Sequence, residues 1–124
     1  MVANLYGLSG RLAMNHSSSS QSPSVIRIAN CSGFYGDKLS AARDMIEGGP
    51  IDVLTGDYLA ELTMAILHSK RVKDDTTGYV GTFLKQFKDV AALCLQRKIK
   101  VVVNAGGLNP EGMANQVKVI LAEQ

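Results

Sequence analysis

The sequence lacks the features that mark several classes of protein. No apolar run approaches the roughly 20 residues that a membrane-spanning helix needs, and the apolar run at residues 101–103 ends at Asn104. Cysteine is scarce, because Cys31 and Cys94 are the only two, too few for a disulfide framework or a cysteine zinc site. These absences exclude a membrane span and a disulfide scaffold, and they favour a reducing, cytoplasmic location.

Acidic residues are missing from the first 36 positions. All 11 Asp and Glu lie at Asp37 or later, together with 11 of the 13 Lys and Arg, so the body of the chain carries no net charge. The formal net charge of +2 comes from Arg11 and Arg27. Because clusters of Lys and Arg bind nucleic-acid backbones, this distribution argues against nucleic acid as a partner.

The length and the apolar content indicate one globular domain. The chain has 124 residues, of which 46% are hydrophobic and 19% charged, the composition of a folded domain. Residues 1–24 differ, since they contain no acid and include the serine run at 17–20. We predict a disordered Ser-rich leader over 1–24 and a folded domain over 25–124. A mitochondrial transit peptide is the alternative for the leader, although such peptides usually contain more arginine.

Strands are predicted where short apolar and β-branched runs occur. They cover residues 25–29, 51–55 and 99–103, and each run ends at a turn signal. The run at 99–103 is almost continuously apolar, which is typical of a strand in a parallel sheet.

Helices are predicted between these strands from apolar residues at spacings of three and four. The second helix is expected to end near His68, followed by a charged, solvated loop over residues 70–75, and Pro110 suits the first turn of the last helix. The four apolar stripes are Leu39, Ala42 and Ile46; Tyr58, Leu59, Leu62 and Ile66; Phe83, Phe87, Val90 and Cys94; and Met113, Val117, Ile120 and Leu121.

This alternation of strands and helices requires parallel strands joined by right-handed crossovers. We therefore predict an α/β fold with a parallel sheet of about three strands and flanking helices, resembling half of a doubly wound domain.

A binding edge is predicted where the strands end. The carboxyl ends of parallel strands share one edge, and the loops at residues 30–37, 55–58 and 104–110 are rich in small and hydrogen-bonding residues. Glycine allows close approach of a ligand, and helix N-termini attract phosphate or carboxylate. The alternative is that these residues only make tight turns. The candidate substrate-binding residues are Asn30, Ser32, Gly33, Gly36, Asp37, Thr55, Gly56, Asp57, Asn104, Gly106, Gly107 and Asn109.

No catalytic set, metal site or cofactor motif is evident in the sequence. The patterns G-x-G-x-x-G and G-x-x-x-x-G-K-[ST] are absent, which disfavours a dinucleotide or a P-loop nucleotide. Asp37 and Asp57 stand where helix N-caps are needed, so we predict capping rather than metal binding for both. Cys31 follows a strand end, where a helix dipole lowers a thiol pKa, but no histidine is placed to assist it, and we interpret it as a buried packing residue.

Two stretches of the chain resemble the N-terminal domain of the acyclic terpene utilisation proteins. They read GGPIDVLTGDYLAE and NAGGLNP, and the resemblance extends over residues 25–124. It implies a role in the catabolism of acyclic terpenoids or branched acyl-CoA compounds. It also implies an anionic acyl ligand at the candidate residues and acyl-CoA carboxylase components as partners. It defines neither a reaction nor a cofactor, so an enzymatic activity is not assigned.

Family members continue beyond a final helix of this type, whereas this chain ends at Gln124. Three strands make about half of a doubly wound sheet, so we expect a truncated domain. The alternative function is a non-catalytic paralogue or an interaction fragment. The strand at 99–103 is expected to be central in a complete fold, and a free edge beside it predicts self-association.

Overall fold

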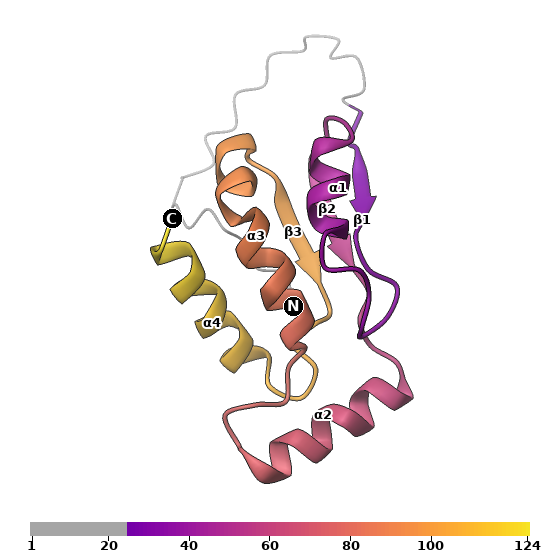
Figure 1. The fold of residues 1–124 in the computed structure, drawn as a ribbon, viewed down its shortest axis with the longest axis vertical. Coiled ribbons are helices and arrows are strands. Elements are labelled where there is room, and N and C mark those ends of the chain that lie inside the picture. Colours follow the sequence, from indigo (N-terminus) through magenta and orange to yellow (C-terminus); the bar gives the residue numbers. More distant parts are fainter. Residues whose placement is uncertain (1–24) are drawn as a thin grey trace, which may run out of the picture.

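The computed structural model describes residues 25–124, and the predicted leader at residues 1–24 lies outside them. The predicted α/β class and element order are confirmed (Figure 1). Within the described part of the chain, no helix is long and apolar enough to cross a membrane. The elements are β1 (Ile28–Asn30), α1 (Ala41–Glu47), β2 (Val53–Gly56), α2 (Glu61–Lys73), α3 (Gly81–Arg97), β3 (Lys100–Val103) and α4 (Pro110–Ala122).

The strands form one parallel sheet in the order β1-β2-β3. Its register places Ile28 beside Val53 and Val53 beside Lys100. The central strand of the described residues is therefore β2, while the apolar strand β3 lies at an edge. The first strand starts at Ile28 rather than at residue 25, because β2, its neighbour, begins at Val53, the partner of Ile28.

The core lies between the sheet and the helices on one of its faces. In Figure 1, α1 and α3 lie in front of the sheet, α4 lies beside α3, and α2 lies beyond the carboxyl ends of the strands. Leu54 and Val101 face this core, in which Ile46, Phe87 and Val90 are almost fully buried. The described residues leave the opposite face of the sheet uncovered, and Ile28 on that face is 66% exposed.

The helices α3 and α4 follow their sequence signals closely. The predicted stripe of α3, from Phe83 to Cys94, is buried, and the helix ends at Lys98, whose φ of 57° closes it in the left-handed conformation. Pro110 occupies the first turn of α4, and the Asn109 side chain accepts a hydrogen bond from the Gly112 N–H.

The second helix departs from its prediction in length and in facing. The predicted loop at residues 70–75 is largely helical, because α2 continues to Lys73. The basic residues of its last turn interact favourably with the negative end of the helix dipole. The predicted stripe is confirmed only in part. Tyr58 is buried and Leu59 packs against the core, but both precede the helix, which begins at Glu61. Within α2, Leu62 is 73% exposed, and Thr63 and Leu67 are buried instead.

Candidate functional site

The loop after β1 (residues 30–37, the first loop) and the loop after β2 (residues 55–58, the second loop) are joined by hydrogen bonds. The Cys31 N–H donates to the Thr55 carbonyl at 2.8 Å, and the Asp57 N–H donates to the Ser32 carbonyl at 2.9 Å. The Thr55 hydroxyl donates to Asn30 Oδ1 at 3.1 Å. Asn30 and Thr55 are paired in the sheet register, so they lie side by side on its uncovered face.

Asn104 joins the loop after β3 (residues 104–110, the third loop) to the second loop. Its Oδ1 accepts a hydrogen bond from the Tyr58 N–H at 2.9 Å, and its Nδ2 donates to Asp57 Oδ1 at 2.6 Å. Asp57 and Asn104 are both exposed. The structure therefore brings Asn30, Thr55, Asp57 and Asn104 to one polar edge.

The predicted capping roles of Asp57 and Asp37 are wrong. The N-cap of α2 is Ala60, without a side-chain hydrogen bond, because the helix begins three residues beyond the position that Asp57 would cap. The N-cap of α1 is Ser40, again three residues beyond Asp37.

Asp37 instead holds the first loop in shape. Its carboxylate accepts hydrogen bonds from the Gly33 N–H at 2.9 Å and the Lys38 N–H at 2.7 Å. These two bonds lower the pKa of the Asp37 carboxyl below its ordinary value. Ser32 also acts within the loop, because it is buried and its hydroxyl donates to the Phe34 carbonyl at 2.9 Å.

Asn109 is engaged apart from the polar edge. Besides capping α4, its Nδ2 donates to the carbonyls of Thr76 and Thr77 at 3.1 and 3.0 Å. No hydrogen bond among residues 25–124 connects its side chain to Asp57 or Asn104. Asn109 thus fixes the segment that precedes α3 against the start of α4.

Several of the candidate glycines are required by packing. A Cβ at Gly56 would lie 2.6 Å from the Tyr58 ring, and one at Gly106 would lie 2.8 Å from Pro110. Gly107 has a φ of +51°, and a Cβ there would collide with Leu67. Tight packing thus explains these positions without a ligand.

The first loop has looser glycines than the other two. A Cβ at Gly33 would meet no heavy atom within 4 Å, and one at Gly36 would make only an ordinary contact of 3.6 Å with Phe34. Packing therefore leaves the glycine at position 33 unexplained.

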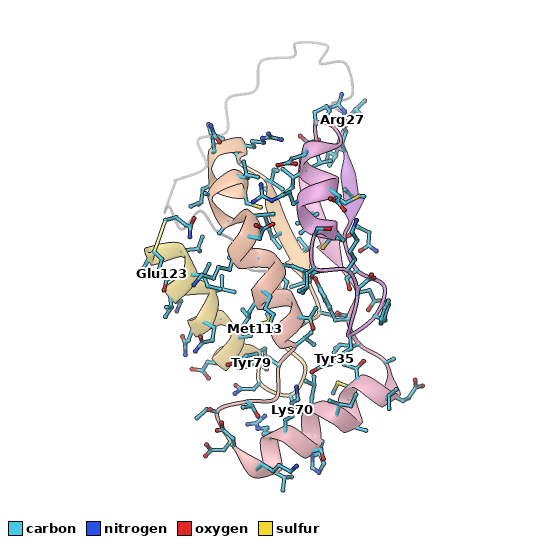
Figure 2. The ribbon with its side chains drawn as sticks, viewed as in Figure 1. Arg27, Tyr35, Lys70, Tyr79, Met113 and Glu123 are labelled. Carbon is cyan, nitrogen blue, oxygen red and sulfur yellow. The ribbon has the colours of Figure 1, made fainter. Side chains whose placement is uncertain are left out.

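Two cations of α2 contact the loops, although the sequence predicted a solvated loop for this segment. Lys70 Nζ donates to the Tyr35 hydroxyl at 2.6 Å and lies 5.3 Å from the centre of its ring, and Figure 2 shows the two residues at the same end of the molecule. The Arg71 guanidinium donates to the Leu108 carbonyl. The spacing from the buried Leu67 to Lys70 and Arg71, three and four residues, places all three on one side of a continued helix.

A buried chain of hydrogen bonds connects the second loop, through α3, to the segment that follows the first loop. The Tyr58 hydroxyl donates to Gln86 Oε1 at 2.5 Å, and Gln86 Nε2 donates to the Lys38 carbonyl at 2.8 Å. Cys31 Sγ lies 3.7 Å from the Tyr58 hydroxyl. Burial raises the pKa values of both the Tyr58 hydroxyl and the Cys31 thiol. Cys31 is thus a neutral packing residue rather than an activated nucleophile.

A surface cavity lies at the opposite end of the sheet, near the amino ends of β2 and β3. None of the candidate residues lines it, and within its walls Arg97 donates to the Ile46 carbonyl at 2.8 Å. In the part of the chain that the structure describes, no group of three or more His, Cys, Asp or Glu side chains is arranged to hold a metal ion. The cavity is lined by Ile46, Glu47, Gly49, Pro50, Ile51, Asp52, Arg97 and Ile99.

Comparison with models of protein families gives a match that covers almost all of the described residues. The family model described as acyclic terpene utilisation family protein AtuA matches residues 26–124. No curated protein and no solved structure matches the chain. The matched region contains every strand and helix described above, together with the whole polar edge.

Proposed function

The chain belongs to the acyclic terpene utilisation family, and from this premise we propose that it binds an anionic acyl compound of terpenoid or branched acyl-CoA catabolism. The proposed site is the edge formed by the carboxyl ends of β1, β2 and β3. Ligands of open α/β sheets commonly bind outside these strand ends. The polar edge (Asn30, Thr55, Asp57 and Asn104), together with the neighbouring Gly33, forms the proposed polar part of this site.

The observation that carries the proposal is the position of Lys70 and Arg71. Both side chains reach from α2 to the loops that follow strands, Lys70 to the first and Arg71 to the third. Within residues 25–124 neither forms an ion pair with a carboxylate. Their polar partners, a phenol and a carbonyl, carry no formal negative charge. Such cations favour the carboxylate or the phosphate groups of the ligand.

The start of α3 adds to this preference for anions. Its N-cap, Val80, has no side-chain hydrogen bond, and its first turn contains no acidic residue. The Val80 N–H donates to the Ala105 carbonyl at 2.9 Å, so this helix terminus lies next to the third loop. Free N–H groups and the positive end of the dipole attract negative charge there. Gly81, the first residue of α3, is a candidate binding residue that the sequence analysis did not suggest. A Cβ added at this position would meet no heavy atom within 4 Å.

The uncovered face of the sheet supplies apolar surface for an acyl chain. Val53 lies two residues before Thr55 on β2, and Val102 is the partner of Thr55 on β3. Both valines are partly exposed. A ligand with its polar group at the strand ends and its hydrocarbon chain along Val53 and Val102 has the chemistry of an acyl compound.

Isothermal titration calorimetry of the full chain tests the proposal. The ligands are a branched acyl-CoA, the corresponding free acid and coenzyme A alone. We expect binding of at least one acyl ligand, and we expect Lys70→Gln to weaken it at least about tenfold, because charge-assisted hydrogen bonds are worth roughly 1.5–3 kcal/mol.

Lys73→Gln is the matched control, because Lys73 lies on the same helical turn and no hydrogen bond or ion pair within residues 25–124 involves its side chain. Its affinity should remain within about twofold of the wild type, a difference below roughly 0.5 kcal/mol. Absence of binding by all three ligands, or equal losses in both variants, contradicts the proposed site.

A further inference from the structure

The outer edge of β1 is unpaired among the described residues. The Cys31 N–H donates to Thr55 and the Arg27 carbonyl accepts from Val53, so Arg27 and Cys31 direct backbone groups toward β2. Backbone groups alternate in direction along a strand. Ile26, Ile28 and Asn30 therefore direct their N–H and carbonyl groups away from the sheet.

This edge is also apolar. Val25, Ile26 and Ile28 are 74%, 65% and 66% exposed, and Arg27 is the only charged residue among residues 25–30. An extended apolar edge with free backbone groups readily pairs with another strand.

The other edge of the sheet has a different character. β3 contains the exposed Lys100, and charged residues on an edge strand oppose pairing. None of the exposed large apolar side chains of residues 25–124 lies on β3. Self-association was expected beside residues 99–103, but these properties favour β1 instead.

We propose that β1 pairs in antiparallel fashion with β1 of a second copy of this chain, across a twofold axis at Ile28. The outward-facing residues are symmetric about this position, so Ile28 lies opposite its own copy and Ile26 lies opposite Asn30. This register forms about six backbone hydrogen bonds, two for each hydrogen-bonded residue pair.

The same register avoids electrostatic repulsion between the two copies. Arg27 falls opposite Ala29, so the two arginines do not face each other. The pairing also places the two Ile28 side chains in contact, and apolar cross-strand pairs stabilise antiparallel strands. A second copy of the chain therefore provides hydrogen-bond partners for the backbone groups of this edge without placing like charges opposite each other.

Sedimentation equilibrium of the full chain over a wide concentration range tests the dimer. We expect a reversible monomer–dimer equilibrium. Ile28→Lys should raise the dissociation constant at least about tenfold, because it places two ammonium groups opposite each other. Leu62→Lys is the matched control, since Leu62 on α2 is 73% exposed and lies away from the strand, and it should leave the dissociation constant unchanged. A monomer at all concentrations, or equal dimerisation of Ile28→Lys and the wild type, overturns the proposal.

A cysteine cross-link gives a second test that does not depend on the folding of Ile28→Lys. Directly opposed residues of a hydrogen-bonded antiparallel pair have Cα atoms about 5.5 Å apart, which lies within the range of a disulfide, about 4.4–6.8 Å. Mild oxidation should convert Ile28→Cys into a covalent dimer and leave Leu62→Cys and the wild type monomeric on denaturing gels. Equal cross-linking of the two cysteine variants, or none in either, overturns the proposed register.

Discussion

The Tyr58→Phe substitution tests whether the buried hydrogen-bond chain supports the loops of the candidate site. Tyr58 is fully buried and Gln86 is 1% exposed, and the tyrosine hydroxyl donates to Gln86 Oε1 at 2.5 Å. Loss of the hydroxyl leaves Gln86 Oε1 buried without this donor. An unsatisfied buried acceptor costs about 1–3 kcal/mol. For a domain of this size each kcal/mol lowers Tm by about 4–8 °C, so we expect a decrease of roughly 5–20 °C.

Urea unfolding followed by circular dichroism measures this cost. The midpoint should fall while the slope of the unfolding free energy against urea stays constant, because the buried area changes little. Tyr35→Phe is the control, since it removes a hydroxyl that contacts Lys70 at the surface, and exposed contacts of this kind contribute about 1 kcal/mol or less. Tyr58→Phe with the stability of the wild type refutes the supporting role of this chain.

Two further predictions concern packing and pH. Gly107→Ala should lower the free energy of unfolding by roughly 1–3 kcal/mol, because φ at this position is +51° and the new Cβ would collide with Leu67. Gly49→Ala is the control: a Cβ at Gly49 meets no heavy atom within 4 Å, so the urea midpoint should be nearly unchanged. Burial raises the pKa of the Cys94 thiol from 9.0 to about 11. The unfolded chain therefore loses this proton first, and stability should fall as the pH rises from about 9 to 11; urea unfolding of Cys94→Ala over this range should show a smaller decrease.

The sheet and the helices α3 and α4 are predictable from the sequence because their signals are local. The stripe from Phe83 to Cys94 matches the helical period, and Pro110 marks the start of α4. The β-branched residues of β3 are likewise sufficient to predict a strand. Parallel pairing then follows from the alternation of strands and helices.

The details of the loops depend on partners distant in the sequence. Asp57 stands near a helix start, but its partner Asn104 lies 47 residues away. The extension of α2 brings Lys70 to Tyr35 and Arg71 to Leu108, contacts that span 35 and 37 residues. No local pattern encodes such contacts, so the sequence predicted capping for Asp57 and a solvated loop for Lys70.

The uncovered face of the sheet also departs from what composition suggests. β3 is almost continuously apolar, as in sheets covered on both faces, but within residues 25–124 one face of this sheet carries no helix (Figure 1). Which face a helix covers depends on the handedness and order of the connections, and apolar content alone does not determine it.

The binding of an anionic acyl compound at the strand ends is tested most directly by NMR titration of the ¹⁵N-labelled full chain with a branched acyl-CoA. The amide signals of Gly33, Asn104 and Gly81 should shift most, and they should follow one saturation curve. Gly49, in the wall of the cavity at the opposite end of the sheet, should be unaffected. Shifts centred on Gly49 and Arg97, or no saturable shift in the loops after the strands, would contradict the account.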